Sequence, residues 1–265
     1  MAVISNELLL ANAGQVSQYV RTVRGHLHQH PEVSGQEYDT SLFLRQELEK
    51  LGLPVETVSA TGLIAVLDTG REGPTVALRA DIDALPMQES QVNLYSTKKF
   101  VSLREGVSHT CGHDGHMAML LGVAKSLTGI KDLLRGSVLF CFEEGEETGS
   151  GIDGMMRALS RYPVAAVWGM HLTSFMNAGT ISVDPGPRMA GETQVQFDVV
   201  GKGGHGSRPD LSINPVFAAA HVLTALGSAW PNRIDANETV TLGIATINGG
   251  TAPNIIPDRV RISGT

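Results

Sequence analysis

The chain has 265 residues, of which 42% are hydrophobic and 18% charged, so it can bury a core and is not a disordered chain. Its 20 Lys and Arg residues against 27 Asp and Glu residues give a net charge of −7 without any basic run, which argues against a nucleic-acid partner. No apolar run reaches the roughly 20 residues of a membrane span, and residues 1–7 lack the cationic start of a secretory signal, so we expect a cytoplasmic protein without a membrane partner.

The first 50 residues predict two helices. Apolar residues between Leu8 and Val23 recur at helical spacing, and Pro31 marks a stop. A second periodic stretch covers 38–51 and is followed by Gly52, a common C-terminal cap. We therefore expect a pair of helices before the first strand.

Three short apolar runs then predict buried strands, at 75–80, 137–142 and 164–170. Continuous apolar runs of this length are typical of strands that are covered on both faces. Helical segments are expected between them, at 116–127 and 154–159. This alternation predicts an α/β fold with a mixed, largely parallel sheet and helices on both faces.

Each of these apolar runs is followed by side chains that bind metals or act as acids and bases. They are Asp81 and Asp83 after the first run, Glu143, Glu144, Glu146 and Glu147 after the second, and His171 after the third. In α/β sheets, ligands bind beyond the carboxyl ends of the strands, so we expect these groups to face one cleft. A lone histidine is more often structural than a ligand, and for His171 both readings stay open.

A second domain is predicted beyond the Pro- and Gly-rich stretch at 184–187. Alternating polar and apolar residues predict strands with one face in water, at 193–199, 239–246 and 259–263. A helix is expected over 214–229. We therefore expect a catalytic domain over 1–188 and a smaller α+β domain over 189–265, with an antiparallel sheet and helices on one face.

The densest group of chemical side chains is the block 109–116, His-Thr-Cys-Gly-His-Asp-Gly-His, here named the Cys/His block. Its three imidazoles and one thiol can curl around one cation, and thiolate and imidazole are ligands that zinc and similar metals accept. Asp114 could orient a ligating histidine. The alternative is a helix that begins at Asp114 with its polar side chains satisfied locally.

The four glutamates within 143–147 repel one another unless a cation neutralises them or some are protonated. The alternative is a solvated acidic loop, which is the usual meaning of a charge run. Their place after a buried strand favours a cleft shared with the Cys/His block, where one glutamate binds a metal and another stays free as a base. Spacing alone does not say which glutamate does which.

Other candidate residues carry less information. Cys141 lies inside a predicted strand and is expected to be a buried small hydrophobe. The spaced histidines between His26 and His30 lie at a helix end, where a structural role is favoured over a metal site. The Gly-rich stretch 201–207 lacks the ending of a phosphate-binding loop, yet it presents His205.

Five segments occur in an order that resembles a known family. They are 79–86 (Arg-Ala-Asp-Ile-Asp-Ala-Leu-Pro), the Cys/His block, the pair Glu146 and Glu147, 169–171 (Gly-Met-His) and 201–205 (Gly-Lys-Gly-Gly-His). Together they resemble the N-acyl-amino-acid amidohydrolases, a branch of the aminoacylase and carboxypeptidase-type metallopeptidases that includes hippurate hydrolase and the indole-acetyl-amino-acid hydrolases. The resemblance covers nearly the whole chain, and the Cys-Gly-His-Asp-x-His block is highly specific to this branch.

The resemblance implies a site for two divalent metal ions, drawn from Zn, Mn, Co and Ni. The ligands it implies are Cys111, His113, Glu147 and His171. Glu146 matches the general base that activates water, and Asp83 matches a carboxylate that supports the ligands from behind. A metal pair makes water more acidic and polarises the amide carbonyl, and the base moves a proton to the leaving amine.

The resemblance also implies that residues 189–265 form a lid through which two subunits dimerise. His205 matches a histidine that reaches the active site of the partner subunit and stabilises the oxyanion, an effect of about 3–4 kcal/mol. Asn254 matches a contact to the substrate carboxylate. The implied partners are a small N-acyl amino acid as substrate and a second copy of the chain in a homodimer.

The chain departs from the family pattern in two places. It has Phe-Glu-Glu-Gly at 142–145, where this branch more often has Gln-Pro-Ala, so substrate specificity stays open. Family members are longer, and no histidine follows His221, so the last histidine ligand of the family is absent from this sequence. We therefore expect a C-terminally incomplete, metal-dependent hydrolase that cleaves the amide bond of N-acyl amino acids. The alternative is a truncated metal-binding remnant with impaired catalysis.

Overall fold

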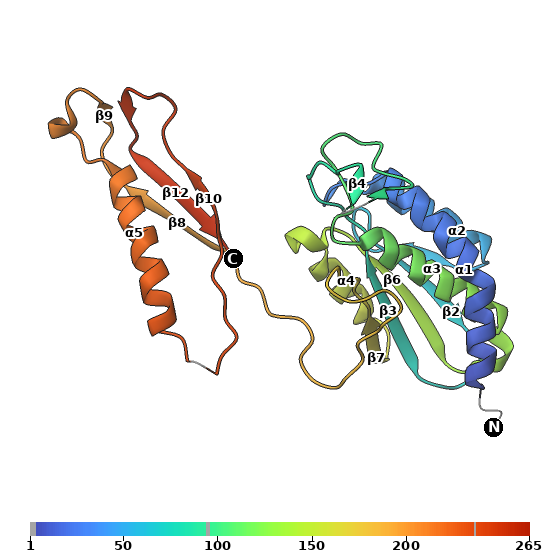
Figure 1. Ribbon diagram of the computed structural model, residues 1–265. Coiled ribbons are helices and arrows are strands. Elements are labelled where there is room, and N and C mark those ends of the chain that lie inside the picture. The colour runs from blue at the N-terminus through green and yellow to red at the C-terminus, as the bar shows by residue number, and fades with distance from the viewer. Residues whose placement is uncertain (1–3, 94–95, 236) are drawn as a thin grey trace. The chain divides into compact units, whose positions relative to one another are not determined.

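The computed structural model describes residues 4–93, 96–235 and 237–265, so residues 1–3 of the N-terminal stretch considered above lie outside it. The chain divides into two compact units, Met1–Thr180 and Ile181–Thr265 (Figure 1). Among the described residues, no helix combines the length and the apolar character needed to cross a bilayer.

The first unit is built on a mixed sheet, which confirms the predicted α/β class. Its strands are β1 (Val55–Thr57), β2 (Leu63–Asp68), β3 (Thr75–Asp81), β6 (Ser137–Glu143) and β7 (Val164–Gly169). In the order β1-β2-β6-β3-β7, the neighbours β6, β3 and β7 run parallel, and β1 and β2 pair antiparallel. β1 and β2 were not predicted, although residues 63–67 form a continuous apolar run like those of the predicted strands.

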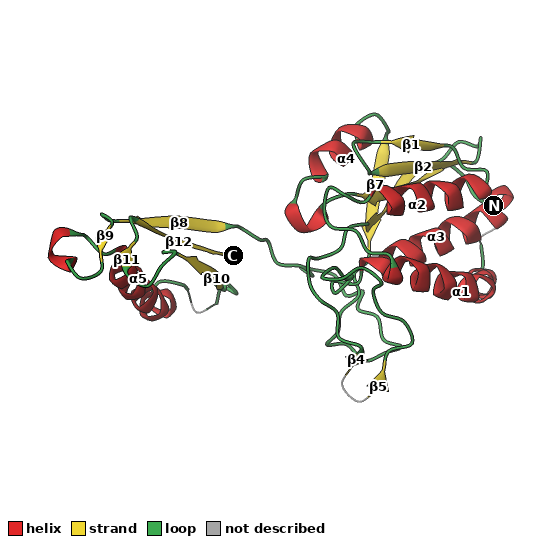
Figure 2. Ribbon diagram, turned by 90° about the horizontal axis from the view of Figure 1, so that it is seen from above, coloured by secondary structure: helices red, strands yellow, loops and turns green. Residues whose placement is uncertain are grey.

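Helices cover both faces of this sheet, as predicted (Figure 2). The burial predicted for 164–170 is wrong, because β7 ends the strand order of the described sheet and is mostly exposed. On one face lie α1 (Asn6–Gln29), α2 (Tyr38–Lys50) and α3 (His113–Gly129), and on the other lies α4 (Ile152–Leu159). The core under the first three helices includes Leu44, Leu121 and Phe140, all fully buried. The core under α4 includes Met155 and Cys141, so Cys141 is a buried small hydrophobe.

Local signals explain where two of these helices begin. Ser5 caps α1, because its hydroxyl accepts a hydrogen bond from the backbone N–H of Leu8 (3.2 Å). α3 begins at His113, directly after Gly112, whose φ of 92° lies in the left-handed region that glycine adopts most readily. The Cys/His block is therefore a turn that runs straight into a helix.

Short elements connect the larger ones in the first unit. They are β4 (Val92–Asn93), β5 (Ser96–Thr97), η1 (Lys131–Leu133) and η2 (Glu146–Thr148), where η marks a 3₁₀ turn. β4 and β5 form a small hairpin in the long connection between β3 and α3. η2 follows β6 and carries Glu146 and Glu147, so both glutamates start from a tight turn at the end of a buried strand.

The second unit has an antiparallel sheet of order β10-β12-β8, which agrees with the predicted α+β character of this region. Its elements are β8 (Val195–Val200), β9 (Gly204–His205), η3 (Pro209–Leu211), α5 (Pro215–Ala229), η4 (Trp230–Asn232), β10 (Ile244–Asn248), β11 (Ile255–Ile256) and β12 (Arg259–Gly264). Ala219 of α5 packs with Val260 and Ile262 of β12 in its core. β9 and β11 form a separate antiparallel ladder.

One strand of the second unit starts later than its alternating pattern predicts. The pattern covers 239–246, whereas β10 begins at Ile244. Its partner β12 ends at Gly264, which lies opposite Ile244, and the pairing continues in two backbone hydrogen bonds between Gly243 and Thr265.

Candidate metal centre

The carboxyl ends of adjacent strands meet at one edge of the sheet in the first unit. Asp81 ends β3, Glu143 ends β6, and His171 follows β7. Because β6, β3 and β7 are parallel neighbours, their ends lie side by side. The first turn of α3 reaches the same edge, where His113 Nε2 lies 3.6 Å from Asp81 Oδ2.

The predicted metal ligands come together at this edge. Cys111 Sγ lies 3.5 Å from His171 Nε2, and His113 Nε2 lies 3.8 Å from both Glu147 Oε1 and Glu146 Oε2. The ligand atoms of Cys111, His113 and His171 all lie within 4.8 Å of one another, as do those of His113, Glu146 and Glu147. Zinc ligands stand about 2.0–2.3 Å from the ion and hence about 3–4 Å from each other. The pair distances of 3.5 and 3.8 Å lie in this range, and His113 belongs to both groups.

Asp83 orients two of these side chains from behind. Its backbone carbonyl accepts a hydrogen bond from His113 Nδ1 (2.9 Å), and its Oδ1 atom lies 3.2 Å from the same nitrogen. Its Oδ2 atom accepts hydrogen bonds from the backbone N–H of Glu147 (3.0 Å) and from the Ser34 hydroxyl (2.7 Å). Because Nδ1 of His113 is the donor, its Nε2 atom carries the lone pair, and this atom is the one that lies near Glu146 and Glu147.

Burial distinguishes Glu147 from Glu146. The Glu147 side chain is 20% exposed, and its Oε1 atom is buried without a hydrogen-bond partner among the described residues. His113 Nε2 is buried and unpartnered in the same described set. The Glu146 side chain is 38% exposed, and burial together with the charge of Asp81 raises its pKa. Glu147 and His113 therefore suit a cation, whereas Glu146 suits a base that must meet water and substrate.

The charges around the cluster favour a cation. Burial and the neighbouring Glu147 carboxylate raise the pKa of the Cys111 thiol to about 12. Although burial opposes it, the hydrogen bond to Asp83 and the charge of Asp81 raise the pKa of His113. A divalent cation would offset the negative charge and favour the thiolate. A set of one thiol, two imidazoles and carboxylates is one that zinc and its neighbours accept, so these residues fit the metal that the motifs imply.

The other two glutamates of the acidic run have structural partners. Glu143 Oε2 lies 2.8 Å from Arg79 Nε. Glu144 accepts hydrogen bonds from the backbone N–H of Gly62 (2.6 Å) and from both the backbone N–H and the hydroxyl of Thr61. The run is therefore not a solvated loop: one pair is bound within the fold, and the other pair faces His113.

Asp81 and His116 also lie at this edge. Asp81 was expected to face the cleft, and His116 was one of the three imidazoles expected to surround a cation, but neither was given a specific role. His116 is fully buried, with Nδ1 2.6 Å from Asp81 Oδ1 and Nε2 accepting a hydrogen bond from the Leu172 N–H (2.8 Å). A ring nitrogen of His116 lies near the ligand atoms of Asp81 and His113, but both ring nitrogens of His116 are already engaged in hydrogen bonds. A signal was present, because residues three apart in a helix, such as His113 and His116, lie on the same face.

The sequence suggested that Asp114 could orient a ligating histidine. In the structure Asp114 instead anchors the Cys/His block to α1. Its Oδ2 atom lies 2.9 Å from His28 Nδ1 and 3.1 Å from Arg24 Nε. His28 Nε2 in turn lies 2.9 Å from Glu89 Oε1. His109 is buried, and burial lowers its pKa to about 4. Neither histidine belongs to a candidate metal group among the described residues.

His205 and Asn254 lie close together in the second unit. His205 is opposite Ile255 in the β9–β11 ladder, and the backbone N–H of Gly206 donates to the carbonyl of Asn254 (2.8 Å). His205 Nδ1 lies 2.8 Å from the Ser207 hydroxyl. The two residues expected to contact substrate therefore share one place in this unit, while the contacts themselves remain predictions.

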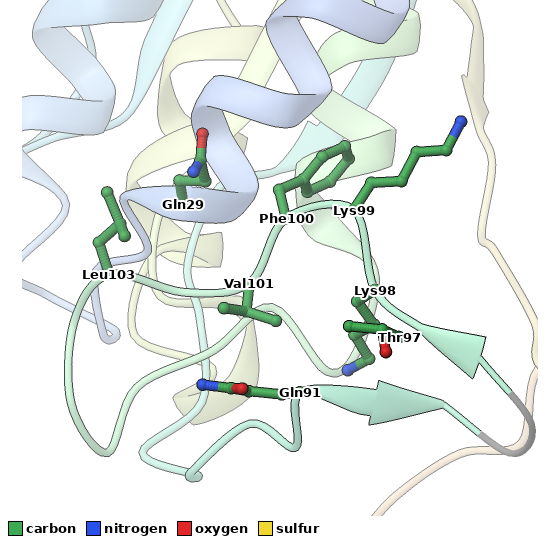
Figure 3. Close-up of a pocket in the computed structure, with 8 residues that line it drawn as sticks. All are labelled: Gln29, Gln91, Thr97, Lys98, Lys99, Phe100, Val101 and Leu103. Carbon is green, nitrogen blue, oxygen red and sulfur yellow. The ribbon is translucent and has the colours of Figure 1, made fainter.

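A separate cavity of about 290 Å³ lies in the first unit beside β5 (Figure 3). Its lining residues are Gln29, Gln91, Thr97, Lys98, Lys99, Phe100, Val101 and Leu103. The Phe100 ring meets His28 of α1 edge-on, with ring centroids 5.3 Å apart. None of the described residues that line this cavity is a predicted site residue. The cavity is therefore distinct from the candidate metal site.

Residues 77–254 match the sequence pattern of Peptidase family M20/M25/M40. The chain is 37% identical over 98% of its length to thermostable carboxypeptidase 2 of Saccharolobus solfataricus, and it covers 66% of that protein. It is 39% identical over 91% of its length to the N-acyl-L-amino acid amidohydrolase of Geobacillus stearothermophilus, of which it covers 65%. It is 36% identical over 98% of its length to IAA-amino acid hydrolase ILR1-like 4 of Arabidopsis thaliana, of which it covers 58%. The chain thus spans slightly less than two thirds of the length of these relatives.

Solved structures have the same fold. A crystal structure from methicillin resistant Staphylococcus aureus matches with a TM-score of 0.81 and 33% identity, over 98% of this chain and 68% of that one. The Bacillus subtilis YXEP protein, described as a dinuclear metal binding peptidase, matches with a TM-score of 0.68 and 32% identity, over 96% of this chain and 64% of that one. Both matches extend over the two units.

Proposed function

The chain belongs to Peptidase family M20/M25/M40, as its motifs predicted, and we propose that it is a metal-dependent hydrolase of the amide bond in N-acyl amino acids. Relatives named as N-acyl-L-amino acid amidohydrolase and as IAA-amino acid hydrolase support this substrate class. The observation that carries the proposal is the convergence of Cys111, His113, Glu147 and His171 beside the more exposed Glu146.

Cys111, His113, Glu147 and His171 would hold the metal. We propose two divalent ions in the complete protein, drawn from Zn, Mn, Co and Ni, and the dinuclear description of the B. subtilis neighbour supports that number. Such ions, when bound, lower the pKa of water toward neutrality and polarise a carbonyl group. Asp83 would keep two of the ligands in place, because it bonds both the His113 ring and the Glu147 backbone.

Glu146 would move the proton during the reaction. Water adds to the carbonyl carbon of the substrate, the C–N bond breaks, and the products are a carboxylic acid and a free amino acid. Glu146 takes a proton from the attacking water and delivers it to the leaving nitrogen. Its greater exposure supports this role, because a base must reach both water and substrate.

The second unit would supply contacts to the substrate. His205 would stabilise the oxyanion in the active site of the partner subunit, and Asn254 would bind the substrate carboxylate. In this proposal residues 189–265 serve as lid and dimer interface in a cytoplasmic homodimer, and residues 1–188 carry the metal. The close placement of His205 and Asn254 supports their action on one ligand.

The test combines metal analysis with hydrolysis assays on this chain and on the longest reading frame that encodes it. Metal-free protein is reconstituted with Zn²⁺, Mn²⁺, Co²⁺ or Ni²⁺ and offered hippurate, N-acetyl-leucine and the dipeptide glycyl-leucine. We expect release of the free amino acid from the two N-acyl substrates. Preference for the dipeptide would instead indicate a peptidase that recognises a free amino terminus.

The outcomes separate the two hypotheses drawn from the sequence. Two ions per subunit together with turnover support the hydrolase. One ion or none, without turnover, supports a metal-binding remnant. The proposed activity is wrong if no metal form of the longest reading frame hydrolyses any N-acyl amino acid.

A further inference from the structure

The backbone of Leu172 restrains the candidate ligand that precedes it. The Leu172 N–H donates a hydrogen bond to His116 Nε2 (2.8 Å), and the Leu172 carbonyl accepts one from His171 Nδ1 (2.6 Å). Because a carbonyl can only accept, Nδ1 of His171 carries the proton, and its Nε2 atom points its lone pair toward Cys111 Sγ, 3.5 Å away. The Leu172 backbone therefore determines which nitrogen of His171 is offered to a cation.

His116 is itself held from the other side. Its Nε2 accepts from Leu172, so its Nδ1 is the donor to Asp81 Oδ1 (2.6 Å), and no lone pair is left for a cation. Asp81 pairs with Arg79 (3.0 Å), which also pairs with Glu143 (2.8 Å). His116 and Asp81 are 0% and 1% exposed, so this arm of the network is shielded from solvent.

The segment after β7 has little burial of its own to hold it. Leu172 is 40% exposed. Its Cβ atom lies so near Gly112 that a Cβ atom added to that glycine would be only 3.3 Å away. The segment therefore lies directly against the turn of the Cys/His block. The rings of His116 and His171 meet edge-on with centroids 4.7 Å apart. His116 thus contacts both the backbone and the ring of the segment that carries the ligand.

We propose that His116 is a positioning residue: braced by Asp81, it holds the Leu172 backbone and thereby sets the orientation of His171 toward the metal. This inference rests on the proposed function, because it concerns the same site. Groups that orient a metal ligand typically change metal affinity by about 10- to 100-fold when they are removed. We therefore expect His116→Ala to weaken Co²⁺ binding by about 10-fold or more.

Titration of the metal-free protein with Co²⁺ tests this role, because the thiolate-to-cobalt band reports Cys111 and the visible bands report ligand geometry. His116→Ala should lower the affinity and change the visible bands. His116→Gln should recover most of the affinity, since its amide oxygen can accept from the Leu172 N–H. Leu121→Ala is the matched control, because it removes a fully buried side chain from the same helix, outside the network. It should lower stability and leave Co²⁺ affinity unchanged.

Amide hydrogen exchange at Leu172 gives a readout that needs no metal. Exchange should be faster in His116→Ala than in the unaltered protein, and unchanged in Leu121→Ala. Unchanged Co²⁺ affinity and spectrum in His116→Ala would overturn the inference and leave the proposed function intact, as would an equal loss of affinity in Leu121→Ala. Failure of the unaltered protein to bind Co²⁺ would overturn both.

Discussion

Arg79 holds two buried carboxylates at the edge of the sheet, Asp81 on its own strand and Glu143 on β6. A guanidinium is planar and always charged, so it can serve both groups at once. The pairing neutralises Glu143 and leaves the other oxygen of Asp81 for His116. The stretch 142–145, where the chain departs from the pattern of its branch, therefore contains a carboxylate, Glu143, that is paired within the fold.

At the same scale, Glu146→Gln should abolish most turnover while metal binding is retained. Glutamine has nearly the same shape but cannot take up a proton, and loss of a general base lowers rates by about 10²- to 10⁴-fold. Metal content should stay the same. Of the two glutamates, it is Glu147 whose carboxylate oxygen is buried without a hydrogen-bond partner among the described residues. Assays of kcat with N-acetyl-leucine and elemental analysis measure the two effects. Glu147→Gln is the matched comparison and should lower metal content as well; an unchanged kcat in Glu146→Gln would contradict its assignment as base.

His28 fastens α1 to the start of α3 and to the connection after β3. Its ring lies between Asp114, which also pairs with Arg24, and Glu89, which also pairs with Lys98. The hydrogen bond to Asp114 above all, with help from Glu89 and against the effect of burial, raises the pKa of His28. When it is protonated, the ring donates to both carboxylates and joins three segments of the first unit.

His28 should consequently contribute more stability in acid than in alkali. A group whose pKa is raised by folding stabilises the fold fully below its ordinary pKa of 6.5, and that contribution is lost as pH rises through the higher folded-state pKa. His28→Gln should lower the free energy of unfolding by about 1.5 kcal/mol near pH 5.5 and by less near pH 8.5. Urea unfolding at both pH values measures the difference.

The matched control for this prediction lies two residues earlier on α1. Burial lowers the pKa of His26, so its neutral form is favoured and its contribution is lost as pH falls. His26→Gln should therefore show the opposite trend. Equal effects of His28→Gln at the two pH values would contradict the prediction.

The elements differ in how far their sequence reveals them. The apolar run at 137–142 and the periodic helix at 38–51 could be predicted, because burial repeats along each of them. The meeting of Cys111 with His171 was also predictable, since parallel strands share a carboxyl edge and the motifs mark both residues. The bond from Leu172 to His116 could not be predicted, because it joins a backbone group to a side chain 56 positions away without any characteristic spacing.

Under the proposed function, metal binding and substrate contact belong to different units. Cys111, His113, Glu147 and His171 belong to Met1–Thr180, whereas His205 and Asn254 belong to Ile181–Thr265. The first unit also has hydrophobic cores of its own on both faces of its sheet. It therefore contains all four proposed metal ligands together with hydrophobic cores of its own.

A chain that stops after Thr180 should keep its Co²⁺ site and lose turnover. It retains all four candidate ligands and the Asp81–His116 pair, so the number of Co²⁺ ions bound per chain should match that of the 265-residue protein. It lacks His205, and loss of an oxyanion donor lowers kcat by about 10²- to 10³-fold. Cobalt titration and hydrolysis of N-acetyl-leucine measure the two effects. Loss of the Co²⁺ site in a shortened chain with native circular dichroism would show that the second unit takes part in metal binding.

All four candidate ligands lie between Cys111 and His171. Because translation proceeds from the N-terminus and domains fold as units, this stretch leaves the ribosome before residues 181–265 have emerged. Every one of these donors is then available while the second unit is still being made. Under the proposed function, a shortage of the ion would therefore act on the nascent polypeptide as well as on the released protein.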